Sequence, residues 1–320
     1  MTRKCAYLFP GQGSQYVGMG RELYDASPAA RAVFEQADVI LGASLSRLCF
    51  EGPAERLNDT SNTQPAIFVA SVAALRALEE RGGHWSETSP NRGGGDSVAY
   101  VAGHSMGEFS ALAAAGAFSF EDGLRLVRER GRLMKEAGER GPGGMAAVIG
   151  LETESLEAIC AETREQSGEH VGVANDNCPG QVVISGAFGP LERAMERAVE
   201  RGARKVVRLA VSIAAHSPLM AEAASEFRAT LDATSFHEPA IPLVANATAG
   251  PLTDPDDIRD ALGRQLTSPV RWTESMRWMI GQGVGRFVEV GPGKVLTGLL
   301  RRIDRGVERL TTAQAIAREV

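Results

Sequence analysis

VAYVAGHSMGEFSALAAAGA, residues 98–117, is the part of this sequence that best indicates both a fold and a chemistry. Residues 98–102 are β-branched, aromatic or small and predict a buried strand. Residues 103–107, Gly-His-Ser-Met-Gly, predict a tight turn, and residues 108–115 predict a helix. Strand, G-x-S-x-G and helix in this order are typical of a nucleophile elbow, with Ser105 at a helix N-terminus that favours negative charge. On this pattern alone an ordinary glycine-flanked turn is an equal alternative.

Length and composition place the chain among globular proteins. Its 320 residues are 43% hydrophobic and 23% charged, enough for one large domain or two unequal ones. The net charge is −6 without a basic block, which argues against nucleic acid and against a polybasic membrane patch. No apolar segment has the length of a signal peptide core or a membrane span, so we expect a cytoplasmic protein.

The four cysteines are scattered along the chain. Cys5, Cys49, Cys160 and Cys178 have no C-x-x-C spacing. This distribution predicts reduced structural thiols and argues against a zinc site.

The pattern of elements predicts a large α/β domain. Residues 4–9 predict a first strand that ends in Pro-Gly-Gln-Gly, a loop that matches neither a dinucleotide fingerprint nor a phosphate loop. Helical patterns follow over 20–57, and Thr63-Gln64-Pro65 is expected to open a helix to residue 81. Residues 82–97 predict a mobile surface loop, and residues 120–137 another helix. Further on, we expect strands at 241–245 and 286–290, a helix at 256–266 and a final helix after Gly291-Pro292-Gly293.

An inserted unit is predicted in the middle of the chain. Residues 138–144, GERGPGG, resemble a hinge. After them strands at 145–149, 170–174, 181–185 and 205–209 and helices at 153–163 and 191–201 give the order β-α-β-β-α-β, which is typical of a ferredoxin-like unit. We therefore expect a large domain of residues 1–137 and 210–320, with a parallel central sheet, and a small subdomain of residues 138–209.

A nucleophilic serine needs a base, and the sequence has five histidines. His84 lies in the predicted loop, His237 in a predicted linker and His170 at the start of a predicted strand. His104 precedes the serine and favours local packing or hydrogen bonding. His216 lies among small residues that leave room for a substrate, so it is the candidate base, with a buried core histidine as the alternative.

Four separated motifs now carry a resemblance. Phe9-Pro10-Gly11-Gln12-Gly13-Ser14-Gln15, Gly103-His104-Ser105-Met106-Gly107-Glu108, Ala215-His216-Ser217 and Val290-Gly291-Pro292-Gly293-Lys294 occur in this order in malonyl-CoA:acyl carrier protein transacylases, which the chain resembles from end to end. The resemblance implies an α/β-hydrolase-like large domain, Ser105 as nucleophile and His216 as base. It places the backbone carbonyl that orients the histidine near Gln265.

The same resemblance implies further roles. The backbone N–H groups of Gln12 and Met106 match the oxyanion hole, and Arg130 matches the arginine that pairs with the malonyl carboxylate. Without the family pattern, Arg125, Arg128 and Arg132 are equal candidates for this role. Positions matching the family's cleft-facing residues are Gln64, Asn175, Asn177 and Gln181.

The implied reaction is ping-pong transfer of malonyl from the CoA thioester to the phosphopantetheine thiol of a holo acyl carrier protein, in fatty-acid or polyketide synthesis. It requires no metal and no tightly held cofactor. We expect a freestanding monomer. An acidic carrier would need a basic docking surface, for which Arg201, Arg204, Lys205 and Arg208 are candidates, with a solvated face as the alternative.

One motif departs from the related polyketide acyltransferases. Malonyl-selective members carry His-Ala-Phe-His and methylmalonyl-selective members Tyr-Ala-Ser-His, whereas this chain has Ile213-Ala214-Ala215-His216. We expect malonyl, with methylmalonyl or a bulkier group open. A serine hydrolase of the α/β-hydrolase type is a rival reading. That fold places its catalytic histidine late in the chain, whereas many residues follow His216, and it gives Gln12 and Arg130 no role. A non-catalytic interaction module is a second rival, but it predicts loss of Ser105, His216 or Arg130.

Overall fold

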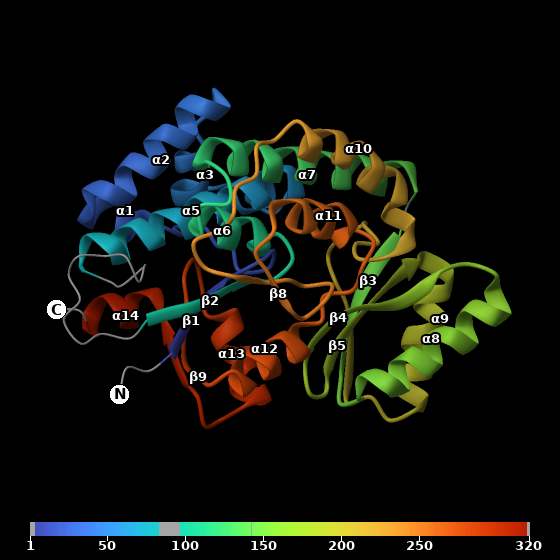
Figure 1. Cartoon of the computed structure of the whole chain (residues 1–320). Helices are drawn as coiled ribbons and strands as arrows, with labels where there is room; N and C mark the ends of the chain where they lie inside the picture. Colours follow the sequence, from blue (N-terminus) through green and yellow to red (C-terminus); the bar gives the residue numbers. More distant parts are fainter. Residues whose placement is uncertain (1–3, 83–96, 142, 319–320) are drawn as a thin grey trace.

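Two β-sheets form the framework of the computed structural model, which describes residues 4–82, 97–141 and 143–318 (Figure 1). The larger sheet has the strand order β10-β9-β1-β2-β7-β8, and the smaller has the order β4-β5-β3-β6. In the larger sheet β10, β9, β1, β2 and β7 run parallel, and β8 pairs antiparallel with β7. The smaller sheet is antiparallel throughout. The chain is therefore a mixed α/β protein with a mostly parallel central sheet and a separate antiparallel sheet.

Strands β1 (Lys4–Phe9) and β2 (Ser97–Gly103) lie at the centre of the larger sheet and are buried on both faces. Tyr7 and Phe9 pack into one apolar cluster with residues of α5 (Thr60–Glu80), α6 (Gly107–Ala114) and α7 (Phe120–Arg140). Ala6 and Leu8 pack into a second cluster with α12 (Trp272–Gly281) and α13 (Val295–Ile303). A strand covered by helices on both sides has no polar face, which explains why these strands are almost continuously apolar. The predicted strand at 98–102 and the helix after it are confirmed as β2 and α6.

The other elements of this half follow the predicted order with three differences. The helix expected to open at residue 63 begins at Thr60, because the Asp59 side chain accepts from the N–H of Ser61 and caps it. Helix α13, expected to be the final helix, is followed by β10 and α14. Strand β8 and helix α12 are present but were not predicted. Of the predicted loop at 82–97, residues 83–96 lie outside the described residues. The remaining elements are α1 (Arg21–Ala26), α2 (Pro28–Leu41), α3 (Leu45–Glu51), α4 (Ala54–Leu57), η1 (Pro218–Met220), α10 (Ala221–Asp232), β7 (Leu243–Val244), β8 (Pro251–Leu252), α11 (Pro255–Gln265), β9 (Val284–Glu289), β10 (Glu308–Thr311) and α14 (Thr312–Arg318).

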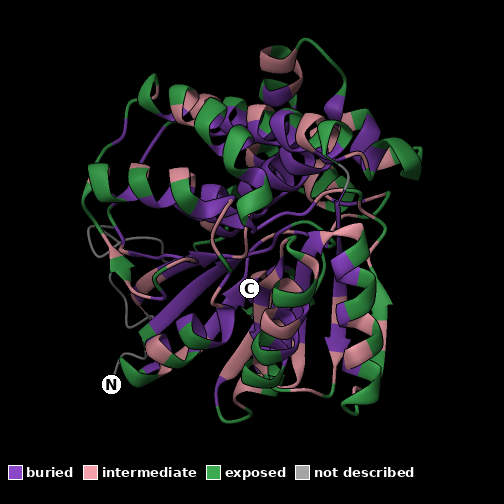
Figure 2. Ribbon diagram, turned by 90° about the vertical axis from the view of Figure 1, so that its right-hand side faces the viewer, coloured by how far each residue is buried: buried purple, intermediate pink, exposed green. Residues whose placement is uncertain are grey.

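The smaller sheet and its two helices have the predicted β-α-β-β-α-β order. The elements are β3 (Gly143–Ile149), α8 (Thr153–Ser167), β4 (Val171–Cys178), β5 (Gln181–Ala187), α9 (Phe188–Glu200) and β6 (Lys205–Arg208). Val148 and Ile184 pack beneath α8 and α9, whereas Met145 and Val183 join the apolar core of the larger half. Figure 2 looks onto this side of the molecule and shows buried strands behind helices whose outer faces are exposed. Both faces of the small sheet are thus covered.

The predicted hinge at 138–144 is wrong at both ends. Helix α7 continues through Arg140, and β3 begins at Gly143. A Cβ at position 138 would lie 2.7 Å from the carbonyl oxygen of Ser212. Gly138 therefore serves close packing inside a helix, and its glycine does not mark a flexible link.

Strand β4 joins the two halves along its carboxyl-terminal part. The N–H of Asp176 donates to the carbonyl of Val270 (2.9 Å), and the N–H of Val270 donates to the carbonyl of Ala174 (2.8 Å). Arg302 on α13 donates to the side chain of Gln181 (2.7 Å). These bonds fix one side of the cleft between the sheets. Within the described ranges, no helix is both long and apolar enough to cross a membrane.

Candidate active site

The turn after β2 holds Ser105 in an unusual backbone conformation. Its φ is 51°, in the left-handed region that non-glycine residues rarely adopt. A Cβ on Gly103 would lie 1.9 Å from the carbonyl carbon of Gly107, and a Cβ on Gly107 would lie 2.2 Å from the carbonyl oxygen of Phe9. Only glycine fits at these two positions, so the turn closes tightly against β1 and places the serine at the N-terminus of α6.

Asn246, which the sequence reasoning missed, locks this turn. Its Oδ1 accepts from the N–H of Ser105 (2.7 Å), and its Nδ2 donates to the carbonyl of Gly103 (2.6 Å). The residue is 2% exposed and follows β7, the neighbour of β2 in the sheet. A polar residue just after a buried parallel strand was the signal that could have revealed it, because ligand sites form at the carboxyl ends of such strands.

His216 lies beside the serine in the orientation of a general base. Its Nε2 is 2.8 Å from Ser105 Oγ. Its Nδ1 lies 2.9 Å from the carbonyl oxygen of Gln265 and 3.1 Å from that of Ser268. Since carbonyls only accept hydrogen bonds, Nδ1 carries the proton and the lone pair of Nε2 faces the hydroxyl. Burial, and next the charge of Arg130, lower the pKa of His216 from 6.5 to about 3, so the ring is neutral and able to accept a proton.

Arg130 is buried within reach of the same serine, with 1% of its surface exposed. Its Nη1 donates to Gln64 Oε1 (2.8 Å), and its Nη2 donates to Gln265 Oε1 (3.0 Å) and to Ser105 Oγ (3.2 Å). Burial lowers the pKa of the guanidinium from 12.5 to about 10, which leaves it charged at neutral pH. The structure thereby separates Arg130 from the neighbours that the sequence could not exclude: Arg125 and Arg132 form ion pairs at the surface, and Arg128 donates to a backbone carbonyl there.

Glu108 lies beneath this arrangement and was also missed. It is 1% exposed, and its Oε1 accepts from the N–H of Asn246 (3.0 Å) while its Oε2 accepts from Gln265 Nε2. Burial raises the pKa of the carboxyl from 4.5 to about 7. The sequence signal was its place in the first turn of the helix that the serine precedes, where an acidic side chain is favoured.

The loop after β1 packs directly against the serine turn. The N–H of His104 donates to the carbonyl of Phe9 (3.0 Å), and a Cβ on Gly11 would lie 2.3 Å from the carbonyl oxygen of His104. In the part of the chain that the structure describes, the N–H groups of Gln12 and Met106 have no hydrogen-bond acceptor. Two unsatisfied backbone donors on loops that pack against each other at Ser105 would suit an oxyanion.

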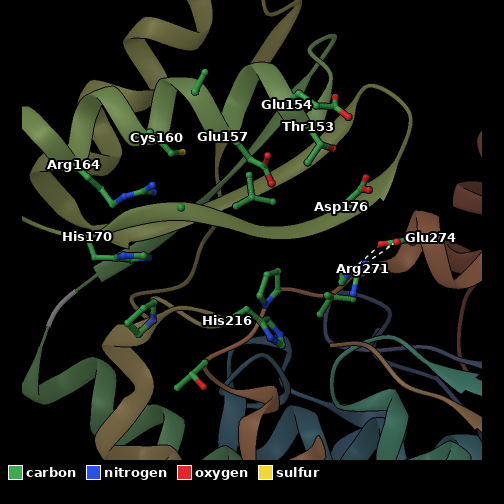
Figure 3. A pocket seen from close by; sticks show the side chains of 18 residues that line it. Thr153, Glu154, Glu157, Cys160, Arg164, His170, Asp176, His216, Arg271 and Glu274 are labelled. Atoms are coloured by element: carbon green, nitrogen blue, oxygen red, sulfur yellow. Dashed lines mark hydrogen bonds and ion pairs between the residues drawn. The ribbon is translucent and has the colours of Figure 1, made fainter. Parts of the chain in front are cut away.

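A cleft of about 1020 Å³ between the two halves leads to His216 (Figure 3). Glu154, Glu157 and Arg164 of α8 lie on one side of it, and the ion pair of Arg271 with Glu274 lies on the other. Asp176 of β4 also lines the cleft, whereas Asn175 and Asn177, which were expected to face it, are 5% and 8% exposed and are absent from its lining.

Asn177 instead connects the small sheet to the serine turn. Its Oδ1 lies 2.7 Å from Nε2 of His104, whose ring also packs edge-on against Trp272. His104 therefore has the local packing and hydrogen-bonding role expected of it. Gln181 lies farther along, where it accepts from Arg302.

Other sequence expectations concern metals and docking. In residues 4–82, 97–141 and 143–318 no group of three or more metal-binding side chains occurs. Of the four basic residues considered for docking, Arg201 is paired with Glu162 and Arg208 with Glu192. Arg204 and Lys205 are exposed at the start of β6.

Nearly the whole chain is similar to known proteins. The family model described as "Acyl transferase domain" matches residues 6–318. The malonyl CoA-acyl carrier protein transacylase of Bacillus subtilis (strain 168) is 44% identical over 310 residues, covering 97% of this chain and 93% of that protein. A crystal structure of an acyl-carrier-protein-S-malonyltransferase from Bartonella henselae superposes with a TM-score of 0.92 at 42% identity and covers 98% of both chains. A type II PKS acyl-carrier protein has been solved in complex with its malonyl-transacylase, and the matching chain has a TM-score of 0.91 at 41% identity, covering 98% of both chains.

Proposed function

The chain belongs to the acyl transferase domain family, and we propose that it moves a malonyl group from malonyl-CoA to the phosphopantetheine thiol of an acyl carrier protein through a malonyl-serine intermediate. The observation that carries the proposal is the buried guanidinium of Arg130, 3.2 Å from the nucleophilic oxygen of Ser105. A hydrolase acting on simple acyl esters has no use for a buried cation there. An enzyme whose acyl group ends in a carboxylate needs one to bind that carboxylate.

The contacts of Arg130 show how the carboxylate could be held. Two of its N–H groups are engaged by the amide oxygens of Gln64 and Gln265, whereas the other contacts of Nη1 and Nη2 go to Met134 Sδ (3.1 Å) and Ser105 Oγ. A thioether is a weak acceptor, and the serine oxygen becomes a poorer one once it is acylated. These two N–H groups would therefore turn to the malonyl carboxylate, in a pair of charge-assisted hydrogen bonds.

The chemistry follows from the orientation of the dyad. Nε2 of His216 takes the proton of Ser105 Oγ as the oxygen attacks the thioester carbonyl, and the N–H groups of Gln12 and Met106 receive the oxyanion. The carbon–sulfur bond breaks, and CoA leaves as the thiol with the proton that His216 held. The carrier thiol then gives its proton to His216 and its sulfur attacks the malonyl ester. The ester carbon–oxygen bond breaks, and the serine oxygen leaves with the proton that His216 held.

The proposal extends to the organisation of the enzyme. Residues 1–137 and 210–320 form an α/β-hydrolase-like domain and residues 138–209 a ferredoxin-like subdomain, which the strand order β4-β5-β3-β6 supports. The cleft between them admits the CoA thioester and then the phosphopantetheine arm. The exposed Arg204 and Lys205 would meet an acidic carrier at the edge of the small sheet. The enzyme would act as a monomer in the cytoplasm, without a bound cofactor. Its four free buried thiols accord with that compartment.

Intact mass spectrometry tests the proposed function. The enzyme is incubated with malonyl-CoA, methylmalonyl-CoA or acetyl-CoA and then with holo carrier protein. We expect a malonyl adduct that moves to the carrier, and no adduct on the Ser105→Ala variant. The matched control is Ser110→Ala. It removes a buried hydroxyl of α6, the helix that follows Ser105, and this hydroxyl has no hydrogen-bond partner in the described residues. Release of malonate to water without transfer would contradict the proposal, and a preference for methylmalonyl would contradict the choice of malonyl.

A further inference from the structure

Glu108 is a buried carboxyl group that the transfer mechanism does not use. Its Oε1 receives the N–H of Asn246 and its Oε2 receives Nε2 of Gln265, so each oxygen faces a donor. A group that must accept on both sides fits as a carboxylate. A neutral carboxylic acid or an amide would set a hydrogen against a hydrogen on one side.

The donor from Gln265 sets the direction of its whole amide. Because Nε2 points to Glu108 and to the carbonyl of Ser105 (3.0 Å), Oε1 points the other way and accepts from Nη2 of Arg130. The same Nη2 contacts Ser105 Oγ. On the opposite side, Gln64 holds Nη1 and is itself oriented by Nε2 donation to Thr60 Oγ1 (3.1 Å). The guanidinium is thus held between two amide oxygens, each of which depends on a further residue for its orientation.

Both supports fix the amide that they contact. The hydroxyl of Thr60 donates to Gln12 Oε1 (3.0 Å), so its oxygen is left to accept from Nε2 of Gln64. The ionised Glu108 only accepts, so it tolerates one orientation of Gln265. If the Gln265 amide turned over, its NH₂ group would face the guanidinium, donor against donor, and would displace Nη2 from the acyl site.

Resting on the proposed function, we propose that Glu108 is a positioning residue for acyl-group selection: its carboxylate fixes the amide of Gln265 so that Arg130 presents Nη2 to the carboxylate of the incoming acyl group. Glu108 touches neither the substrate nor the reacting atoms. Its effect on the reaction passes through Gln265 and Arg130 and concerns only acyl groups that carry a carboxylate.

Glu108→Gln tests this, because it keeps the shape of the side chain and removes acceptance on one side. The matched control is Glu289→Gln. Glu289 is also fully buried, and its two oxygens also accept two backbone N–H groups, from Leu296 (2.9 Å) and Thr297 (2.7 Å), at the start of α13. Loading of Ser105 is followed by rapid-quench mass spectrometry at pH 8, where Glu108 is ionised, with malonyl-CoA over a range of concentrations and with acetyl-CoA as the acyl group without a carboxylate.

We expect Glu108→Gln to raise the half-saturating malonyl-CoA concentration about tenfold, the loss expected for a hydrogen bond to a charged group, with little change in acetyl loading. Glu289→Gln should change neither. In a Gln265→Met background, Glu108→Gln should add nothing, because the residue through which it acts is gone.

The results that overturn the inference differ from those that overturn the proposed function. Unchanged malonyl saturation in Glu108→Gln, or an equal loss of malonyl and acetyl loading, would mean that Glu108 only supports the fold through Asn246. Full additivity with Gln265→Met would also exclude the route through Gln265. If the wild-type enzyme forms no malonyl adduct, the proposed function itself fails.

Discussion

The side chains of Ser105 and His216 meet at 2.8 Å, and both residues have a positive φ, 51° and 57°. A non-glycine residue in this region costs about 1–3 kcal/mol and persists where its surroundings hold it. Asn246 holds the serine through its N–H, and the carbonyls of Gln265 and Ser268 hold the imidazole. Among the described residues the other non-glycine residue with a positive φ is Ala249, so two of the three such positions are the residues whose relative position matters most for proton transfer.

His216→Ala tests the role of the base. Without a proton acceptor beside Ser105, acylation by malonyl-CoA should slow by about 10²–10⁴-fold, the usual contribution of a general base. Rapid-quench mass spectrometry measures this rate. The matched control is His170→Ala, because His170 lines the same cleft but lies apart from His216 (Figure 3). A similar loss in both variants would show that the cleft, and not the base, had been damaged.

Arg130→Lys separates positive charge from guanidinium geometry. A lysine keeps the charge but cannot hold Gln64, Gln265 and a carboxylate together in one plane. We expect malonyl loading to fall by about 10²-fold, while acetyl loading stays level or rises. The matched control is Arg132→Ala. Arg132 lies two residues farther along α7, on its exposed face, where it pairs with Glu129, so both rates should stay unchanged. Undiminished malonyl selectivity in Arg130→Lys would refute the carboxylate-binding role.

Asn246→Asp should impair the serine turn although the substitution preserves shape. The carboxylate can still accept from the N–H of Ser105, but it can no longer donate to the carbonyl of Gly103. It also places a negative charge beside Glu108 at a position that is only 2% exposed. We expect a loss of about 2–4 kcal/mol in the free energy of unfolding and slower acylation of Ser105. Urea unfolding and adduct formation measure the two effects. Wild-type behaviour in both would show that Asn246 does not hold the turn.

The local patterns predicted the elements well because strands β1 and β2 and helix α6 are encoded by contiguous residues. The elbow could be read from two glycines, each two residues from the serine. Gly103 is required by the turn itself, whereas Gly107 is required by the close approach of Phe9. Arg130 could not be distinguished from its neighbours by pattern, since burial against Gln64 and Gln265 depends on helices α5 and α11, far away in the sequence.

The missed residues have the same explanation. Asn246 bonds to Ser105 across 141 positions, and Gln265 bonds to Glu108 across 157 positions. No periodicity or spacing rule reports such contacts. The hinge was misplaced for a related reason: a glycine that packs against a backbone and a glycine that gives flexibility look alike until the partner, here Ser212, is known.

Gly11→Ala should damage the oxyanion site without removing any polar group. Its Cβ would lie 2.3 Å from the carbonyl oxygen of His104, so the Gln12 loop and the serine turn must separate. We expect at least a tenfold loss in the acylation rate, since an oxyanion donor would be displaced. Gly298→Ala is the control, because a Cβ there meets nothing within 4 Å. Equal rates in Gly11→Ala and the wild type would mean that the two loops can separate without harm.

His216 and Glu108 contribute to the pH dependence of stability with opposite signs. The pKa of His216 is lowered from 6.5 to about 3, so the unfolded chain binds the extra proton between these values. This contribution to stability is present above pH 6.5 and is lost as the pH falls toward 3. The pKa of Glu108 is raised from 4.5 to about 7, so here the native state binds the extra proton. Its contribution is present below pH 4.5 and is lost as the pH rises through 7.

Between pH 4.5 and 6.5 the two contributions therefore nearly cancel in the wild type, and removing either group should expose the other. In His216→Gln the free energy of unfolding should rise, relative to the wild type, as the pH falls through this window. In Glu108→Gln it should fall. Each slope should differ from that of the wild type by about 1.4 kcal/mol per pH unit, the value for one proton. Urea unfolding at several pH values measures these slopes on the whole chain. Because all other titrating groups are common to the three proteins, slopes that stay parallel would show that neither group has the shifted pKa that its burial implies.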